Sequence, residues 1–361
     1  MFERIENPRD PVCQQELEAI ANCGLDWSPF RDRTVLVTGA TGLVGSYTVR
    51  ALAAVNRIHG LNMHIIGLVR DIAKARSIYG SLLDRDDMAL LRGDVRSPIQ
   101  CDRPVHFIIH GASVTASKTM VTQPVETIAT AVEGTKHILQ FAANQEILSM
   151  VYISSMEMYG SPDPELEQVS ETDYGYVDVL NVRSCYPEGK RMCECLCAAY
   201  ASEYRLPVKI ARLAQTFGAG VSPNEGRVFA QFARSLQNGE DIVLHTQGNS
   251  YGNYCATCDC VRGLLTILLR GSDGEAYNVV NERTNMRIRD MARMVADRSG
   301  GKIQVRFDIP DDAGRYGYAP DVKMRLSGAK LRGLGWAPEV DLPEMYRRLM
   351  ASWDAQRSGG R

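Results

Sequence analysis

Short apolar runs alternate with longer amphipathic stretches along most of the chain, beginning near residue 34. The β-branched run TVLVT at residues 34–38 precedes SYTVRALAAVNRI, in which apolar residues recur at helical spacing. Runs that are apolar throughout are typical of strands buried on both faces of a parallel sheet. Further strands of this kind are predicted at residues 63–69, 105–113, 147–155, 206–214 and 275–281.

Helical patterns separate these strands, and the two longest cover residues 125–145 and 190–205. Strands and helices in alternation predict an α/β fold of the Rossmann type. This is a doubly wound parallel sheet that binds its ligands at the carboxyl ends of the strands. The residues that follow apolar runs, and are therefore expected at such ends, are Gly39, Asp94, Ser113 and Ser155.

The first strand end carries a glycine-rich turn, TGATGLVG, with Gly39, Gly42 and Gly45. A tight turn, close approach of the backbone to a pyrophosphate, and close packing of helix on strand all favour glycine. The helix that follows offers unpaired N–H groups and the positive end of its dipole to phosphates. A strand, a glycine turn and a helix in this order predict a dinucleotide-binding site.

The residue after the second strand usually distinguishes the two nicotinamide dinucleotides. A carboxylate there binds the ribose hydroxyls of NAD, whereas an arginine accommodates the additional phosphate of NADP. The sequence at this point is Arg70-Asp71, so both readings stay open. NAD is the expected cofactor, and NADP is the alternative because of Arg70.

These features together resemble a known enzyme family. TGATGLVG, a strand that ends in Ser154-Ser155, and the pair Tyr186-x-x-x-Lys190 about thirty residues later resemble the extended short-chain dehydrogenase/reductases. This family contains nucleotide-sugar epimerases, dehydratases and decarboxylases. The resemblance covers the chain from about residue 34 to residue 336. Within the family, the segments most similar to UDP-glucuronate decarboxylases are SSMEMYG, NVRSCYPEGKRMCECLCAAY, IARLAQTFG and NEGRVFAQF.

The resemblance implies a small C-terminal substrate-binding lobe beside the dinucleotide-binding domain. Residues 1–30 are expected to form an N-terminal helical extension. Residues 31–216 and 254–282 are expected to form the NAD(P)-binding Rossmann domain, and residues 217–253 and 283–361 the lobe. The active site is expected between the two.

The resemblance gives the tyrosine and lysine a chemical role. Tyr186 would take the proton from a substrate hydroxyl while hydride passes to the nicotinamide. A free phenol has a pKa of about 10, and Lys190, one helical turn away, would favour its ionised form. Ser155 is expected to hydrogen-bond the same substrate hydroxyl. Glu157 is expected beside the sugar, where it would handle a proton or position the substrate.

Further site residues follow from the same resemblance. Those expected to bind the cofactor are Gly39, Thr41, Gly42, Leu43, Val44, Gly45, Arg70, Asp94, Val95, Ala112, Ser113, Tyr186, Lys190 and Leu213. Those expected to bind the substrate are Ser113, Glu157, Gln215 and Arg227.

Four positions depart from the family pattern. Met156 stands where sugar 4,6-dehydratases carry an aspartic acid, and a thioether cannot donate a proton. Gly252 stands where decarboxylases and many relatives carry an arginine that reaches the substrate. Ala131 replaces the usual Asn, and Gln215 replaces an Asn or His. The substrate, or the fate of its keto intermediate, is therefore expected to differ from the standard one.

The favoured function is NAD-dependent modification of a nucleotide sugar through a transient keto-sugar, with UDP-glucuronate decarboxylation as the leading reaction. The alternatives are a nucleotide-sugar 4-epimerase, an NADP-dependent keto-reductase, and a cofactor-binding protein without catalysis. The family also implies a homodimer formed by two helices, at about residues 124–144 and 187–204. Small residues on these helices permit close approach.

Composition limits the other classes of function. The formal net charge is −2, so there is no basic excess to recommend a nucleic-acid or membrane partner. The N-terminus has no apolar signal region, and a cytoplasmic location is expected. Ten cysteines include C-x-C-x-C at residues 193–197 and C-x-x-C-x-C at 255–260. Alternate cysteines on a helix point to different faces, so no metal site is expected.

Overall fold

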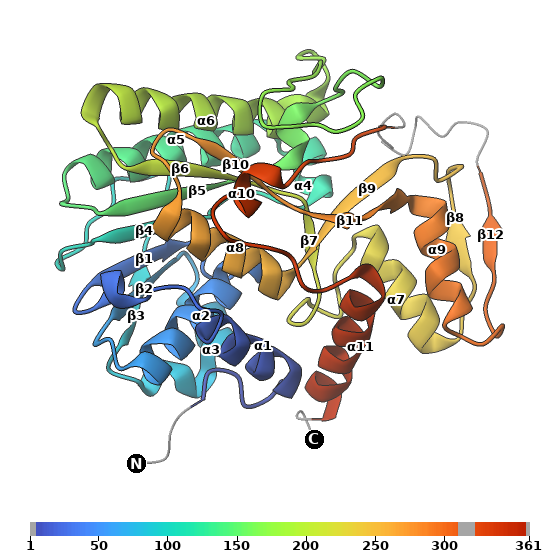
Figure 1. The fold of residues 1–361 in the computed structure, drawn as a ribbon, viewed down its shortest axis with the longest axis horizontal. Helices are drawn as coiled ribbons and strands as arrows, with labels where there is room; N and C mark the ends of the chain where they lie inside the picture. Colours follow the sequence, from blue (N-terminus) through green and yellow to red (C-terminus); the bar gives the residue numbers. More distant parts are fainter. Residues whose placement is uncertain (1–4, 310–321, 359–361) are drawn as a thin grey trace.

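A seven-stranded parallel sheet forms the centre of the protein (Figure 1). A computed structural model describes residues 5–309 and 322–358 of the chain. The strand order is β10-β6-β5-β4-β1-β2-β3, so the chain winds outward in both directions from β1 and β4. The predicted Rossmann-type fold is therefore confirmed. Residues 310–321, which belong to the expected substrate-binding lobe, lie outside the described part.

The apolar runs identified in the sequence form strands of this sheet, in some cases trimmed at their ends. The strands are β1 Thr34–Thr38, β2 His64–Val69, β3 Met88–Arg92, β4 Phe107–His110, β5 Ser149–Ser155, β6 Val208–Leu213 and β10 Ala276–Val279. The strand expected at 105–113 is shortened to β4, because the backbone N–H of Ala112 turns to the Thr38 hydroxyl, at 3.1 Å.

Helices cover both faces of the sheet (Figure 1). Helices α5 and α6 pack together over β4, β5 and β6 on one face, and α2 and α8 pack on the other. The helices of this part are α1 Pro11–Ala21, α2 Leu43–His59, α3 Ile72–Tyr79, α4 Ser117–Thr122, α5 Pro124–Ala143, α6 Cys185–Tyr204 and α8 Thr257–Arg270. A short 3-10 turn, Met156–Tyr159, follows the carboxyl end of β5. A second, Val182–Ser184, leads into α6.

Two smaller sheets lie beyond the carboxyl ends of the central strands (Figure 1). One consists of β11 Asn281–Arg287, β9 Tyr251–Ala256 and β7 Gln215–Phe217, and the other of β12 Val305–Phe307 and β8 Ile242–Leu244. The helices of this part are α7 Val228–Asn238, α9 Ile288–Asp297, α10 Ala329–Arg332 and α11 Leu342–Ser358. Stacked rings of Phe217 and Phe229, 4.4 Å apart, join β7 to α7. The central sheet therefore continues into a second layer of structure on the side where ligands bind in such folds.

The N-terminal helix α1 is held to the rest of the protein by buried charges. The Glu6 carboxylate pairs with Arg57 at 2.9 Å and Arg85 at 2.8 Å. Glu16 on α1 accepts a hydrogen bond from the Tyr47 hydroxyl and pairs with Arg348 of α11 at 2.9 Å. These contacts tie both ends of the described chain to helix α2.

A buried ion pair fixes helix α6 against the sheet. Arg212 on β6 and Glu194 on α6 are 2% and 6% exposed, and their side chains meet at 2.7 Å. The Ser154 hydroxyl donates to the same carboxylate, and the Arg212 guanidinium also donates to the Tyr159 hydroxyl at 2.9 Å. Because charges buried at this depth need every partner, the network sets the position of α6 on the sheet.

Removal of Arg212 should therefore destabilise the protein severely. Arg212→Ala leaves the Glu194 carboxylate buried without its cation, which typically costs about 3–5 kcal/mol. Arg293→Ala is the matched control, since its pair with Asp290 at 3.4 Å is exposed and should change stability by less than about 1 kcal/mol. Urea denaturation of both variants measures the difference. Equal free energies of unfolding would contradict the assigned role of the network.

Candidate active site

The glycine turn between β1 and α2 has the shape needed to hold a pyrophosphate. Gly39 has φ of +67°, and a Cβ there would lie 2.7 Å from the Gly111 carbonyl. A Cβ on Gly45 would overlap the Gly39 carbonyl oxygen. Helix α2 begins after Gly42 with no side chain capping its N–H groups. The backbone N–H groups at the N-terminus of α2 are therefore not covered by side chains of the turn. Such an arrangement is suited to binding the phosphates of a dinucleotide.

Four other predicted cofactor residues lie at or just beyond the carboxyl ends of β2, β3 and β6. Arg70 follows β2 directly and is exposed, while Asp94 lies just beyond β3 and pairs with Arg96 at 3.1 Å. Val95 is buried, and Leu213 ends β6. Strands β2 and β3 follow β1 in the sheet, whereas β6 is separated from β1 by β4 and β5. The binding roles of all four residues stay predictions.

A histidine that was not predicted as a functional residue holds this strand edge together. His110 ends β4, is fully buried, and its Nδ1 lies 2.7 Å from the Thr38 hydroxyl of β1. Burial and the nearby Lys190 charge lower the pKa of His110 to about 3, so the ring is neutral at physiological pH. The Thr38 oxygen in turn accepts the N–H of Ala112, at 3.1 Å. The only signal in the sequence was a polar residue inside the apolar run VHFIIH.

Tyr186 and Lys190 lie one turn apart at the beginning of α6, and both are buried. The Lys190 Nζ donates to the Ile153 carbonyl at 2.8 Å and lies 5.7 Å from the centre of the Tyr186 ring. Burial lowers the pKa of Lys190 to about 8. Burial raises the pKa of Tyr186, and the Glu157 charge adds to this effect. Within the polypeptide alone, the phenol is therefore held neutral, although the sequence suggested that Lys190 favours its ionisation.

Ser155 and Glu157 reach the same place from the end of β5. Hydrogen bonding with the Ser155 side chain lowers the pKa of Tyr186, opposing the effect of burial. The Glu157 carboxylate pairs with Arg183 at 2.8 Å. The Arg183 guanidinium lies 5.8 Å from the centre of the Tyr186 ring. The structure therefore brings the predicted Ser155, Glu157, Tyr186 and Lys190 together, and it adds Arg183, which was not predicted.

Arg183 comes from the short 3-10 turn that leads into α6, three residues before Tyr186. Its side chain is 31% exposed and that of Glu157 is 43% exposed, so both ends of the pair are open to a ligand. A basic residue just before a Tyr-x-x-x-Lys helix was visible in the sequence. Its partner was not, because Glu157 lies 26 residues earlier in the chain.

Space at Gly252 is filled by a neighbouring tyrosine. A Cβ on Gly252 would overlap the hydroxyl of Tyr254, two residues further along β9. Tyr254 is fully buried, packs edge-on against Phe217 at 5.7 Å, and its hydroxyl has no hydrogen-bond partner in the described residues. An arginine at this position therefore requires Tyr254 to move. The ring occupies the room from which an arginine side chain would extend.

The two remaining substrate candidates are placed differently. Arg227 precedes α7, pairs with Glu225 at 2.8 Å, and its charge lowers the pKa of Tyr186, so it lies within electrostatic reach of the site. Gln215 begins β7 opposite Tyr254, in the small sheet. No contact joins Gln215 to Tyr186 or Glu157 among the described side-chain hydrogen bonds.

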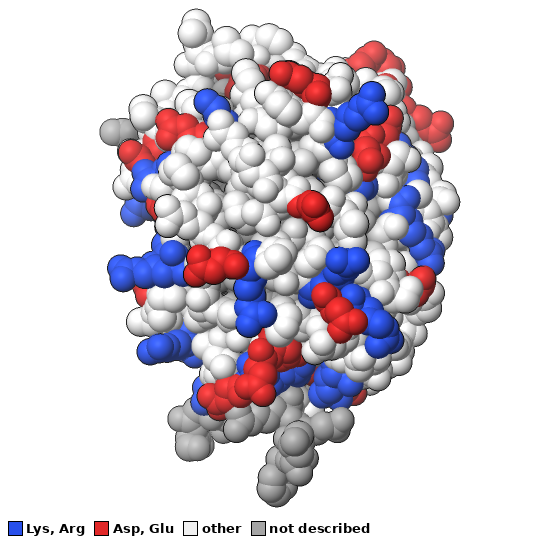
Figure 2. Space-filling view, turned by 90° about the vertical axis from the view of Figure 1, so that its left-hand side faces the viewer, with Lys and Arg blue, Asp and Glu red and all other residues white. Residues whose placement is uncertain are grey.

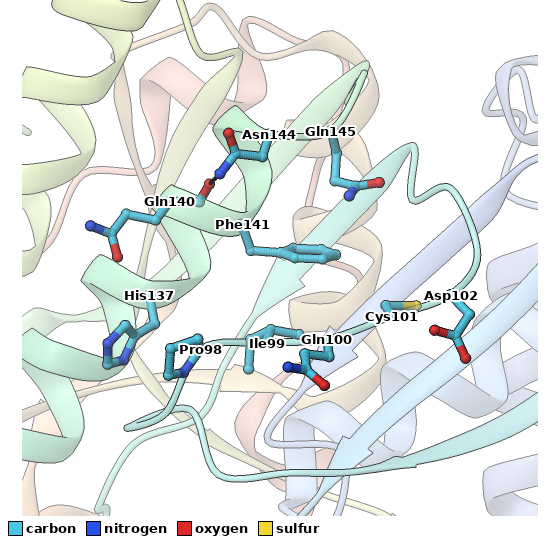
Figure 3. Close-up of a pocket in the computed structure, with 10 residues that line it drawn as sticks. All are labelled: Pro98, Ile99, Gln100, Cys101, Asp102, His137, Gln140, Phe141, Asn144 and Gln145. Atoms are coloured by element: carbon cyan, nitrogen blue, oxygen red, sulfur yellow. Dashed lines mark hydrogen bonds between the residues drawn. The ribbon is translucent and has the colours of Figure 1, made fainter.

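A surface cavity lies away from these residues (Figure 3). A cavity of about 650 Å³ lies between α5 and the segment that leads into β4, with Phe141, His137 and Gln140 on its helix side. It lies toward the amino ends of the strands, opposite the glycine turn.

Charged side chains of both signs are interspersed on the face shown in Figure 2, which offers no extended basic surface.

The part of the chain that the structure describes contains neither a grouped set of metal ligands nor a helix able to span a membrane. No three His, Cys, Asp or Glu side chains there are grouped to hold a metal ion, and the cysteines are free. Within residues 5–309 and 322–358, none of the helices combines the length and apolarity that crossing a membrane requires.

The parallel sheet and the glycine turn together are those of a dinucleotide-dependent enzyme. The sequence model of the NAD dependent epimerase/dehydratase family matches residues 35–280. The chain therefore belongs to this family. It is 29% identical over 315 residues to UDP-glucuronic acid decarboxylase 1 of Xenopus tropicalis, covering 86% of this chain and 70% of the relative. It is also 29% identical to UDP-glucuronic acid decarboxylase 3 of Arabidopsis thaliana, covering 86% of both.

Solved structures share the fold. UDP-glucuronic acid 4-epimerase from Bacillus cereus, in complex with UDP-glucuronic acid and NAD, superposes with a TM-score of 0.72 at 20% identity, over 90% of this chain and 99% of the other. The dTDP-glucose 4,6-dehydratase from Streptomyces venezuelae, with NAD bound, gives a TM-score of 0.72 at 24% identity, over 89% and 97%. At these identities the likeness concerns the fold.

The lowered pKa of Lys190 makes stability depend on pH in a defined direction. Its folded pKa of about 8 lies below the ordinary value of 10.5, so the unfolded chain binds the proton more tightly between these values. Stability should therefore rise with pH in this window, by up to about 3 kcal/mol, relative to Lys190→Met. Urea denaturation of both proteins at about pH 7 and about pH 10 measures this difference. A difference that stays constant would show that Lys190 is not desolvated.

Proposed function

We propose that the protein modifies a nucleotide sugar through a transient keto-sugar, and that its substrate is a uronate that loses CO2. The observation that carries this proposal is the pairing of Arg183 with Glu157 beside the buried Tyr186. The partly exposed Arg183 therefore lies next to Tyr186, which is the acid–base group of the proposed reaction. The names of the decarboxylase relatives support the same choice of substrate.

Each residue has one task in this scheme. A bound dinucleotide would supply a hydride acceptor and, in its oxidised form, a positive charge. Tyr186 takes the proton of the substrate hydroxyl, and Ser155 holds that hydroxyl by a hydrogen bond. Lys190, fixed by the Ile153 carbonyl, supplies positive charge that stabilises the phenolate form of Tyr186, which is the form that accepts this proton. Burial of this pair excludes water and strengthens the charge interaction.

Arg183 is assigned the substrate carboxylate. A guanidinium binds a carboxylate through two parallel hydrogen bonds, and Arg183 is already held in a carboxylate pair by Glu157. A uronate that replaces Glu157 as partner would free Glu157 to handle a proton. This assignment also accounts for the lack of an arginine at position 252. Tyr254 fills the space that such an arginine would need, and Arg183 supplies the cation in its place.

The chemistry that follows needs no acid beside Glu157. Oxidation of the hydroxyl β to the carboxylate gives a β-keto acid, which loses CO2 as its electrons move into an enolate. The carbon that carried the carboxylate then takes up a proton in place of CO2, and the hydride and the phenolic proton return to the ketone. Dehydration would require an acid to protonate the departing hydroxyl, and Met156 cannot donate a proton. Epimerisation needs no such acid either, so it is the alternative reaction that the experiment must distinguish.

Mass spectrometry after incubation with candidate nucleotide sugars tests the proposal. UDP-glucuronate should lose CO2, whereas dTDP-glucose, UDP-glucose and GDP-mannose should not lose water. Tyr186→Phe should lower turnover by about two to four powers of ten, while folding is retained. Arg183→Gln should raise KM for the uronate more than tenfold, roughly the value of a charge-assisted contact. Arg234→Gln is the control, because that side chain binds only the Pro223 and Glu225 carbonyls in the described structure.

Loss of water from a neutral hexose would contradict the proposal. Isomer formation without loss of mass would replace decarboxylation by epimerisation. Net consumption of reduced dinucleotide by a ketone would identify a reductase, and the absence of any turnover would favour a non-catalytic protein.

Assembly into a homodimer is part of the proposal. Apolar side chains at Val121, Val125 and Ile128 line one outer side of α4 and α5 and are 44–73% exposed. Met192, on the neighbouring α6, is 51% exposed. Two such helix pairs would bury each other's apolar surface in a four-helix bundle around a twofold axis. We also propose the division into a dinucleotide-binding domain and a substrate-binding lobe at the boundaries expected from the sequence.

Light scattering coupled to gel filtration should therefore give twice the mass of the chain at micromolar concentration. The double variant Val125→Glu/Met192→Glu should elute as a monomer, because two buried carboxylates would be desolvated without partners. Val243→Glu is the control, since Val243 is 43% exposed on the separate strand β8. A monomeric wild-type protein would refute this part of the proposal.

A further inference from the structure

A carbonyl of the glycine turn is held by a side chain that comes from another part of the fold. The carbonyl belongs to Ala40, which follows Gly39 and is fully buried. The hydroxyl of Tyr79, the last residue of α3, donates a hydrogen bond to it from 39 residues away in the chain. Tyr79 is also buried. The contact therefore joins helix α3 to the turn between β1 and α2.

Close packing leaves the Ala40 peptide little freedom to move. A Cβ on Gly67 of β2 would lie 3.2 Å from the Ala40 Cβ, and a Cβ on Gly45 of α2 would lie 3.1 Å from the Ala40 Cα. The two glycines let the strand and the helix approach the turn this closely. With β2 and α2 packed against Ala40, the Tyr79 hydroxyl is the donor that fixes the direction of its carbonyl.

The direction of this carbonyl also sets the direction of the next N–H group. In a trans peptide, the C=O of one residue and the N–H of the next point to opposite sides. The Thr41 N–H therefore points away from Tyr79. It has no hydrogen-bond acceptor among the described residues, whereas the Gly42 N–H donates within the turn to the Gly39 carbonyl at 2.9 Å. Thr41 is thus a backbone donor available to a ligand, and its orientation depends on Tyr79.

Arg50 of α2 supports the Tyr79 ring. Its guanidinium lies 5.4 Å from the centre of the ring and donates to the Ile78 carbonyl at 2.5 Å. The Arg50 Nε donates to the Glu6 carbonyl at 3.2 Å. Glu6 precedes residues 35–280, which match the family model, so this support comes from a segment that the model does not cover. Burial raises the pKa of Tyr79, so its hydroxyl stays protonated and remains a donor.

We propose that Tyr79 is a positioning residue for dinucleotide binding, which fixes the Thr41 N–H as a donor to the pyrophosphate. Phosphate oxygens accept hydrogen bonds from backbone N–H groups at helix N-termini, and α2 begins two residues after Thr41. Tyr79 acts through the turn and does not touch the dinucleotide. The inference rests on the proposed function only for dinucleotide binding, and it adds a residue that lies outside the glycine pattern.

Calorimetric titration without a sugar tests the inference. The ligands are ADP and whichever of NAD and NADP binds the wild-type protein more tightly, since all of them carry two linked phosphates. Tyr79→Phe should weaken the binding of each by roughly tenfold, about the value of one hydrogen bond. Tyr47→Phe is the matched control, because the buried Tyr47 hydroxyl on α2 donates to Glu16 and not to the turn. The control should leave the dissociation constants unchanged.

The amide signal of Thr41 in an NMR spectrum gives a readout that a general loss of stability would not produce. In the wild-type protein this signal should shift when ADP is added. In Tyr79→Phe the shift at saturation should be smaller, because the N–H no longer has a fixed direction. Arg50→Lys keeps a cation beside the Tyr79 ring and should bind ADP more tightly than Arg50→Met does.

Unchanged affinity in Tyr79→Phe would overturn the inference. An equal loss of affinity in Tyr47→Phe would overturn it too, since the effect would then reflect general destabilisation. Failure of the wild-type protein to bind any of these ligands would have the same consequence. The readout is independent of turnover. Binding that depends on Tyr79, without conversion of any nucleotide sugar, would therefore refute the proposed function while leaving this inference standing.

Discussion

Desolvation of three polar groups on one face of α6 is the constraint on which the active site depends. Tyr186, Lys190 and Glu194 follow one another at intervals of one helical turn, and all three are buried. Buried polar groups must be bonded, so each fixes the helix at one point. Lys190 binds the Ile153 carbonyl, and Glu194 binds Arg212. The helix can therefore lie in only one position, and this position brings the phenol to the end of β5.

The same constraint explains the electrostatics of the site. Burial lowers the pKa of Lys190 to about 8 and raises the pKa of Tyr186. The phenol therefore stays protonated until further positive charge arrives, and the oxidised nicotinamide of a bound dinucleotide carries such a charge. In the proposed reaction, acid–base chemistry at Tyr186 would in this way be coupled to cofactor binding. Arg183 and Glu157, being partly exposed, form the side of the site that can exchange partners with a substrate.

Local patterns in the sequence were sufficient for the fold, and the family resemblance that they carry predicted Ser155, Tyr186 and Lys190, which the structure brings together. The glycine turn, the buried strands and the Tyr-x-x-x-Lys pair are short-range features, and each depends on residues within about one or two turns of one another. Arg183 and His110 were missed because their roles come from partners 26 and 72 residues away, Glu157 and Thr38. The filling of Gly252 by Tyr254 was missed for a different reason. It depends on a side-chain rotamer, which spacing does not specify.

The central claim is that hydride leaves the sugar and returns to it within one active site. UDP-glucuronate carrying deuterium at C4, the carbon β to the carboxylate, tests this claim most directly. After incubation, mass spectrometry of the product should show loss of CO2 with the deuterium retained, together with a slower rate than that of the unlabelled substrate. Loss of the label from the sugar, or its accumulation in reduced dinucleotide, would contradict the account.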